Sequence, residues 1–547
     1  MELLAAGLGG LILLTQPILR RISVQEVREA LTNGEIIEDY PYAGHPIDPA
    51  ATRMFTTERD QTRQTNLLTA LIAAAVLAAA AYFGGRASLR WLELALAAIV
   101  VPVLLKRPVL GLLALVLASL LLPMEFGTGT EVRLNPASLL VPALLALWLL
   151  DGVRRRAIRL AASRATQPLL LFLAAGLLSL LIGNATWDPM VPRRDSFLLV
   201  QLAQWAIFAF SAGAFWLAAS WVRDETWLRR LTAVFLLVGG GFAILRVAPE
   251  VHGLAERVTT AAFIRAPFWV LLSGLAWGQL LFNRQLTREW RAFLLSVSAA
   301  VVLYAFVQQR EGASNWVGLV ATLGLLLWLR LPRLRWPVAA IIVILAVLGL
   351  LFPSVYSFAG GDVEWNLSGG SRLVLIERVV QVTLRNPITG LGPAAYRPYA
   401  NMQPLAYLGA FWLDPQINSH NNYVDLFAHV GLLGLGLFVW FACEVARLGQ
   451  QLRGRYTKGF AAGYVNGMLA VGAGSLVIMA LADWILPFVY NIGFEGFQAS
   501  VLVWLFMGGL MALENFRGQE AGDKGQESHG DASRSGGRSQ KAERESV

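Results

Sequence analysis

Long apolar runs recur along most of this chain of 547 residues, and they constrain its fold more than any other feature. Hydrophobic residues make up 56% of the sequence, charged residues make up 15%, and the mean hydropathy is +0.55. No single soluble core accommodates so much apolar surface, whereas repeated runs of about twenty residues match the hydrocarbon thickness of a bilayer. The sequence therefore predicts an all-α, polytopic membrane helix bundle.

The runs predict about fourteen membrane spans. They fall near residues 66–84, 90–105, 108–124, 135–150, 166–183, 197–219, 229–249, 266–283, 292–307, 314–330, 337–353, 421–443, 459–484 and 496–514.

Alternate connections between these runs are rich in arginine, and the positive-inside rule places such connections in the cytoplasm. The remaining connections then face outward, and an even number of spans places both termini in the cytoplasm. The connections expected outside are 185–195, 250–265, 308–313, 354–420 and 485–495.

Three regions are expected along the chain. Residues 1–65 form an N-terminal cytoplasmic segment, in which the apolar run 2–19 lies in the interface or spans as an extra helix. It lacks the features of a removable signal peptide. Residues 66–514 form the transmembrane bundle, with 354–420 as its large outward loop. Residues 515–547 are polar and are expected to be a disordered cytoplasmic tail.

The cysteine content and the charge distribution argue against several other kinds of protein and site. Cys443 is the only cysteine, so an intrachain disulfide is excluded and a cysteine-based metal site is disfavoured. The net charge of +9 comes from arginines in short clusters between apolar runs, a distribution that orients a membrane protein. We therefore expect a lipid bilayer, and no nucleic acid, as the partner of these charges.

The sequence SHNNYVDLFAHVGLLGLGLF, residues 419–438, places His420 where a polar loop enters a spanning helix. Polar side chains near the hydrocarbon need a hydrogen-bond partner or access to water, so they usually have a function. Two interpretations remain open: His420 belongs to a chemical site, or Ser419, His420 and the two asparagines form an interfacial cap.

Residues 371–385 of the outward loop predict an amphipathic helix that lies on the membrane or on the bundle. Ser371 is its expected N-cap, which places Arg372 beside unsatisfied backbone N–H groups, a setting suited to a phosphate. Alternatively, the arginines of this helix touch lipid head groups. The expected apolar face comprises Leu373, Ile376, Val380 and Leu384.

Two further features of the outward connections suit an anionic ligand. Arg310 lies in an outward connection, where the positive-inside rule does not predict an arginine. It therefore either reaches outer head groups or binds an anion between helices. Gly390 and Gly392, in the sequence NPITGLGPAAY, permit a tight turn or a close approach of the backbone to a ligand.

Three segments resemble the O-antigen ligase-like family of bacterial membrane glycosyltransferases, which includes O-antigen ligases, O-antigen polymerases and protein O-oligosaccharyltransferases. The first, residues 368–396, is similar to a Ser-Gly-Arg helix followed by Pro-x-x-Gly-x-Gly and an aromatic residue. The second, residues 419–438, is similar to a His-Asn/Ser pattern with Gly-x-x-Gly. The third, residues 309–313, resembles a Ser-Arg-Gly segment. The matching positions are Pro387, Gly390, Gly392 and Tyr396, then His420, Asn421, Gly431 and Gly434, and finally Arg310.

The chain departs from the family pattern at several positions. Gln309 stands where a serine is usual, Glu311 follows the arginine, and Ile376 replaces a tryptophan. The segment 256–269 matches only faintly, which leaves Arg257 and Arg265 without an expected role.

The resemblance implies transfer of a glycan from a polyprenyl diphosphate carrier, outside the inner (plasma) membrane, to a hydroxyl of a glycan, lipid or protein acceptor. No cofactor and no metal are implied, because arginine grips phosphate oxygens in place of a metal. The implied catalytic residues are Arg310 and Arg372 on the diphosphate and His420. The imidazole either takes the proton from the attacking hydroxyl, which is the favoured role, or contacts the diphosphate in its protonated form. The implied substrate-binding residues are Arg378, Gly390, Gly392, Tyr396 and Asn421.

Four other polar residues near the spans have two interpretations each. Asp425 and His429 stand four apart on one helix, as a structural hydrogen-bonded pair or as a proton relay to His420. Asp483 and Glu495 bracket the last outward connection, where we expect structural polar contacts rather than acceptor binding.

The competing function is a lipid-linked oligosaccharide transporter or flippase, which needs a polar path through the bundle. The expected spans are nearly free of ionisable residues, which favours an enzyme acting on one side. A noncatalytic membrane scaffold is the third alternative.

Overall fold

The computed structural model describes residues 103–104, 106–128, 132–156, 160–250, 253, 259–309, 313–350, 357–358, 370–402, 405–407, 411–413 and 419–516, all within one compact unit, Ala95–Val547. The N-terminal segment 1–65, the run 66–84, nearly all of the run 90–105 and the tail from 517 lie outside the described residues. Arg310 lies outside them as well.

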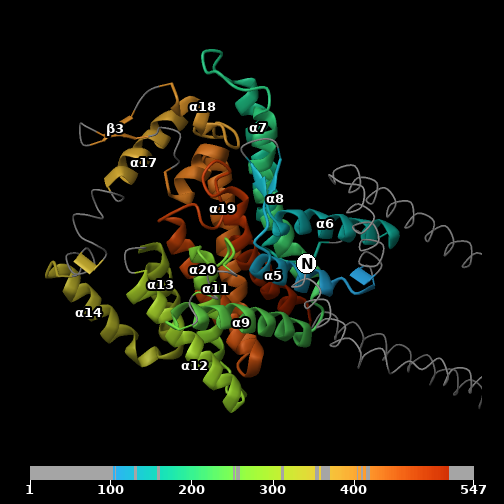
Figure 1. The fold of residues 1–547 in the computed structure, drawn as a ribbon, viewed down its shortest axis with the longest axis vertical. Coiled ribbons are helices and arrows are strands. Elements are labelled where there is room, and N and C mark those ends of the chain that lie inside the picture. Colours follow the sequence, from blue (N-terminus) through green and yellow to red (C-terminus); the bar gives the residue numbers. More distant parts are fainter. Residues whose placement is uncertain are drawn as a thin grey trace, which may run out of the picture. The chain divides into compact units, whose positions relative to one another are not determined.

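The described part of the chain is a bundle of helices with two short β-hairpins, which confirms the helical membrane fold (Figure 1). The helices are α5 (Val109–Leu121), α6 (Pro136–Arg154), α7 (Thr166–Ala185), α8 (Phe197–Trp221), α9 (Glu225–Val247), α11 (Ala266–Phe282), α12 (Arg288–Leu303) with the π-helix η1 (Tyr304–Gln308), α13 (Ala313–Arg330), the 3₁₀ helix η2 (Pro332–Leu334), α14 (Arg335–Val347), α17 (Gly370–Thr383), α18 (Tyr396–Ala400), α19 (Asn422–Arg455), α20 (Gly459–Met479) and a last helix, Gly493–Phe516. The hairpins pair β1 (Phe126–Gly127) with β2 (Arg133–Leu134), and β3 (Leu405–Tyr407) with β4 (Phe411–Leu413).

Eight described helices are long and apolar enough to cross a membrane, or nine if the bent pair α13 and α14 is one span. The runs expected to be spans from 108 onward all coincide with helices, but α5 and α11 have only 13 and 17 residues. The pair α13 and α14 bends by 110° where the sequence predicted two separate spans. Pro332 explains the break, since proline disfavours helical backbone in the residue before it and has no N–H to donate. The count of fourteen remains a prediction.

Connections that the sequence assigned to the same side meet in space. Among those expected outside, Arg385 pairs with Asp188 at 2.8 Å, and Arg265 pairs with Glu495 at 3.3 Å. At the arginine-rich end, the guanidinium of Arg453 donates to the carbonyl of Leu329 at 3.0 Å. The bundle therefore has two chemically distinct ends, which we call the outward end and the arginine-rich end.

Helix α17 lies at the outward end of α19, near α18 (Figure 1). It buries Leu375, Val379 and Val382, whereas Leu373 and Leu384 are exposed. The expected apolar face was therefore wrong, because the buried face lies at a different angle around the helix axis. Apolar residues occur on every side of α17, and packing against α18 and α19 decides which side is buried. Ser371 lies inside the first turn rather than at the N-cap.

Candidate functional site

The residues SHNN form the capped entrance to α19. The Asn421 side chain accepts hydrogen bonds from the backbone N–H groups of Tyr423 and Val424, at 3.0 and 3.3 Å. The Ser419 hydroxyl donates to Asp425 at 2.6 Å. His420 stands between these capping residues with a φ of +51°, in the left-handed region that histidine enters more readily than most residues. The cap thus fixes the backbone from which the imidazole projects.

The same entrance holds the connection between α20 and the last helix, residues 480–491, which we call the site loop. Asn421 donates to the carbonyl of Ala480 at 3.1 Å. Asn422 donates to the carbonyl of Leu486 at 2.8 Å and accepts from the backbone N–H of Ile485 at 3.0 Å. These amides bond a segment about sixty residues later in the chain to the start of α19, so the two segments form one structure.

Arg372 reaches the site loop from α17. Its guanidinium Nη1 donates to the carbonyl of Leu481 at 3.0 Å, next to the residue held by Asn421. Arg372 also lies close enough to His420 for its positive charge to affect the imidazole. The expected convergence of Arg372 and His420 is therefore present, across three segments far apart in sequence.

Asp483 is the buried acid of this site, with 1% of its surface exposed. Its two oxygens accept hydrogen bonds from the backbone N–H of Phe488 and from the Asn491 side chain, both at 2.8 Å. Burial raises the pKa of Asp483, although its hydrogen bonds and the positive charge of a protonated His420 oppose the rise. The structural contacts expected for Asp483 are thus accompanied by an electrostatic link to His420.

The charge state of His420 is set mainly by burial, which lowers its pKa below 6.5. The carboxylate of Asp483 raises that pKa, and the guanidinium of Arg372 lowers it further. The net lowering leaves the imidazole neutral at neutral pH. A neutral imidazole accepts a proton, which is the state required of a general base.

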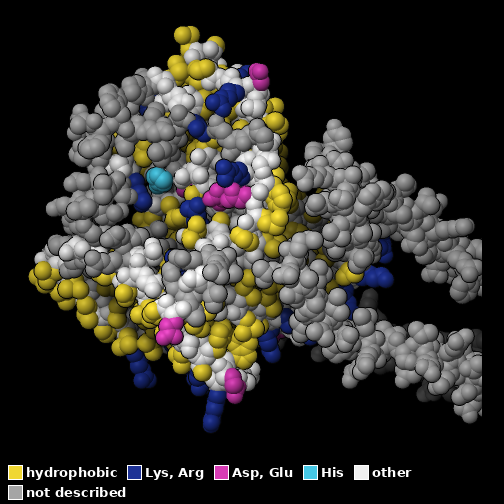
Figure 2. Space-filling view, viewed as in Figure 1, with side chains coloured by type: hydrophobic (Ala, Val, Ile, Leu, Met, Phe, Trp, Pro, Cys, Tyr) yellow, Lys and Arg dark blue, Asp and Glu magenta, His cyan; other side chains and the backbone are white. Residues whose placement is uncertain are grey.

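Other arginines surround the site loop. The guanidinium of Arg397 lies 4.2 Å from the ring centre of Tyr490, and that of Arg265 lies 5.7 Å from the ring centre of Trp484. Figure 2 shows a histidine at the surface with basic side chains beside it and a basic and acidic cluster nearby. The site is therefore cationic, with Asp483 and Glu495 as its acidic members. Within the described residues, no group of three or more His, Cys, Asp or Glu side chains is arranged to hold a metal ion.

The predicted glycine turn packs against α19. Leu391 donates its backbone N–H to the carbonyl of Ala428 at 2.9 Å, and a Cβ on Gly390 would lie 2.6 Å from the backbone nitrogen of Gly431. Gly431 interrupts α19 with a φ of +66°. The segment 387–392 thus inserts where the helix is broken, and this close approach requires glycine at 390 and 431.

A substitution at Gly431 tests this packing. Gly431→Ala should destabilise the fold by about 2–4 kcal/mol, because its Cβ would overlap the backbone of Ile388 and its φ is left-handed. Gly436→Ala on the same helix is the control, since nothing lies within 4 Å of its added methyl. Thermal unfolding in detergent measures both variants. Equal midpoints would refute the tight insertion.

The other residues predicted to bind substrate take different positions. Gly392 and Tyr396 are buried, and Tyr396 packs in an outward cluster with Val379 and Tyr399. Arg378 is partly buried and donates to the carbonyl of Ala400 at 3.4 Å. Asn421, in contrast, bonds the site loop directly.

Asp425 and His429 were expected to hydrogen-bond to each other, but their side chains bond other residues. The Asp425 carboxylate accepts from Ser419, and the His429 Nδ1 accepts from the backbone N–H of Ala394 at 3.0 Å. His429 is therefore a structural residue that fixes the glycine turn.

The sequence did not identify the site loop as part of the site. Asp483 and Glu495 were visible only as polar residues flanking an apolar run, and nothing local linked them to His420. The adjacent asparagines at 421 and 422 were the one sequence signal for such a contact, because amide side chains at the start of a helix need hydrogen-bond partners.

Part of the chain is similar to a known protein family. Residues 311–439 match the family model of O-antigen ligase, a segment that contains Arg372, the glycine turn and His420. No curated protein matches the chain. The matched segment ends before the site loop begins. Residues 311–439 of this membrane protein are therefore similar to the O-antigen ligase family, the resemblance that the sequence motifs predicted.

Proposed function

We propose that this protein transfers a glycan from a polyprenyl diphosphate carrier to an acceptor hydroxyl at its outward end. The observation that carries the proposal is the meeting of Arg372 and His420, both inside the segment that matches the O-antigen ligase model, with the site loop that lies outside it. The positive-inside rule supports an outward end outside the plasma membrane, with both termini in the cytoplasm.

In the proposed reaction the acceptor oxygen attacks the anomeric carbon of the glycan. The bond from that carbon to the diphosphate oxygen breaks, and the bonding electrons leave with the polyprenyl diphosphate. The acceptor hydroxyl gives its proton to the neutral imidazole of His420. No other reactant is consumed, so atoms and charge balance.

Arg372 would stabilise the charge that develops on the leaving diphosphate. A guanidinium offers several N–H donors in a planar fork and stays charged at any working pH. Because Arg372 also binds the carbonyl of Leu481, its position is tied to the loop that lies beside His420. We assign Arg310 the same role from the sequence alone.

The remaining residues would shape the site. Asn421 positions the site loop, and the buried Gly390, Gly392 and Tyr396 support the wall formed by the glycine turn. Arg378, on α17, extends the cationic surface. We propose these residues as the substrate-binding set.

An apolar crevice supports a lipid carrier as the donor. A cavity of about 220 Å³ lies between α19, α20 and the last helix, and hydrophobic side chains form most of its wall. It reaches Met479 and Ile485, which flank the residues held by Asn421 and Arg372. A polyprenyl chain in this crevice would end beside the cationic site.

Purified protein in vesicles, supplied with a lipid diphosphate glycan and an acceptor, tests the proposal. Transfer to the acceptor with release of polyprenyl diphosphate is expected. Movement of intact donor between leaflets without bond cleavage would establish the flippase alternative instead. Glycans accumulating in a deletion strain separate the acceptor classes, since loss of a ligase leaves long unattached chains and loss of a polymerase leaves single repeats.

The lowered pKa of His420 predicts a pH dependence. Transfer should be constant near neutral pH and fall as the pH drops through the His420 pKa, below 6.5, because only the neutral imidazole takes the proton. Asp483→Asn removes the charge that raises this pKa, so the acid limb should move to still lower pH. The dependence of kcat/KM on pH in both proteins measures the shift. A limb that stays fixed would separate Asp483 from His420.

A further inference from the structure

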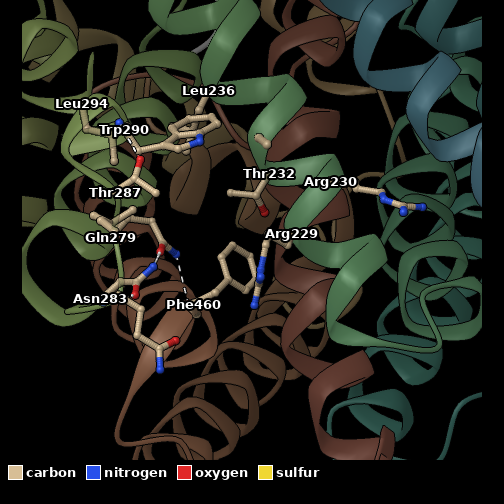
Figure 3. Close-up of a pocket in the computed structure, with 13 residues that line it drawn as sticks. Arg229, Arg230, Thr232, Leu236, Gln279, Asn283, Thr287, Trp290, Leu294 and Phe460 are labelled. Carbon is tan, nitrogen blue, oxygen red and sulfur yellow. Dashed lines mark hydrogen bonds between the residues drawn. The ribbon is translucent and has the colours of Figure 1, made fainter. Parts of the chain in front are cut away.

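A second cavity lies at the arginine-rich end of the bundle. Its volume is about 430 Å³, and α9, α11, α12 and α20 surround it (Figure 3). Phe460, in the first turn of α20, lines it, whereas the site loop follows the last turn of the same helix. A helix of 21 residues is about 30 Å long, so this cavity is separate from the candidate site.

The wall of this cavity is mainly apolar. Ala233, Leu236 and Leu294 line it together with the rings of Trp290 and Phe460. Its volume falls within the roughly 300–1,000 Å³ typical of small-molecule sites. Such a wall suits a hydrocarbon chain.

The amides in the wall already bond one another. The Gln279 side chain donates to the carbonyl of Phe460 at 3.1 Å, and the Asn283 side chain donates to Gln279 at 2.8 Å. Figure 3 shows these bonds along one side of the cavity. Because this network satisfies itself, the interior does not demand a polar ligand.

The rim, in contrast, is cationic. Arg229 is exposed, and its guanidinium lies 5.5 Å from the ring centre of Phe460, at the edge of the cavity. Arg230 also lines the cavity, but its guanidinium points outward in Figure 3 and lies over Trp227. The two segments that form the rim, 223–230 and 284–291, contain six arginines and three acidic residues. The rim therefore carries a net positive charge.

We propose that this cavity binds an anionic phospholipid from the leaflet at the arginine-rich end. Part of an acyl chain would occupy the apolar interior, and the phosphate would lie at Arg229 and the neighbouring rim arginines. Basic pockets between membrane helices are suited to anionic head groups, and Trp290 is an aromatic residue of the kind enriched at membrane interfaces. The inference depends on this cavity alone and does not require glycan transfer.

Native mass spectrometry of the full-length protein tests this site. The protein is exposed to equal amounts of phosphatidylglycerol and phosphatidylcholine with the same acyl chains, and the retained lipids are counted. We expect phosphatidylglycerol to be retained at least about fivefold more than phosphatidylcholine. Arg229→Gln should lower its retention about fivefold, since one basic contact is lost.

Two variants define the place of binding. Ala233→Trp fills the cavity from α9 and should abolish the preference for phosphatidylglycerol. Arg333→Gln is the matched control, because Arg333 is an exposed arginine of the same end that does not line the cavity. It should retain the lipid like the unchanged protein. Thermal unfolding without added lipid verifies that each variant is folded. If Ala233→Trp fails to fold, Arg229→Gln still tests the site, because Arg229 is exposed.

Three results would overturn the proposal. Equal retention of the two lipids would remove the role of the head-group charge. Retention of phosphatidylglycerol by both Arg229→Gln and Ala233→Trp would show that the lipid binds elsewhere on the protein. Displacement of the lipid by glycerol 3-phosphate would show a site for a free phosphate rather than for a phospholipid.

Discussion

His420→Ala should reduce glycan transfer by about 10²- to 10⁴-fold, the contribution typical of a positioned general base. The partly buried imidazole has a lowered pKa, so the substitution removes a neutral proton acceptor at the site loop. Turnover of a lipid diphosphate glycan by purified protein measures the loss. The protein should still insert and fold, because the cap of α19 is made by Asn421 and Ser419 rather than by His420.

The control for His420→Ala is Gln381→Ala. Gln381 is exposed on α17, where its side chain contacts Glu377 at 2.9 Å, so its removal leaves the site intact. Its turnover should stay within about twofold of the unchanged protein, as for most surface substitutions. Near-normal turnover of His420→Ala would end the assignment of this residue as the base.

Arg372→Lys should lower kcat by about 10²- to 10³-fold although the positive charge is kept. Lysine lacks the planar fork that grips phosphate oxygens at two points, and the charge on the leaving diphosphate grows in the transition state. KM for the lipid donor should change less than kcat. Steady-state kinetics at several donor concentrations separate the two parameters.

Arg385→Lys provides the matched comparison for Arg372→Lys. Arg385 follows α17 and pairs with Asp188 at the surface, with 54% of its side chain exposed. Such exposed pairs contribute little, so this variant should behave like the unchanged protein. If Arg372→Lys lost no more activity than Arg385→Lys, then Arg372 would serve only to hold Leu481 or to contact lipid head groups.

The sequence predicted the helical membrane class and the family because both depend on local patterns. Apolar runs of membrane length and alternating arginine clusters are readable without knowledge of the fold. The motifs around Gly390 and His420 lie within one continuous segment, which the family match covers. The two ends of the bundle followed from the same arginine pattern.

Packing decided what the sequence left open. The buried face of α17 was mispredicted, because Leu375 and Leu373 are equally apolar and only the neighbouring helices distinguish them. The partner of Asn422 is a backbone about sixty residues away, and no periodicity encodes such a contact. The bend between α13 and α14 was not predicted, since the sequence indicated two separate spans, although Pro332 lies at the break.

The dependence of the entrance of α19 on a later connection has a consequence for grafting experiments. Replacing only residues 311–439 by the matching segment of an O-antigen ligase would bring the motif residues without the connection whose backbone carbonyls Arg372 and Asn421 use. Such a hybrid would pair foreign side chains with a host connection of a different sequence. We therefore expect that exchange of the proposed activity needs cotransfer of residues 480–491, which would make the smallest portable unit discontinuous.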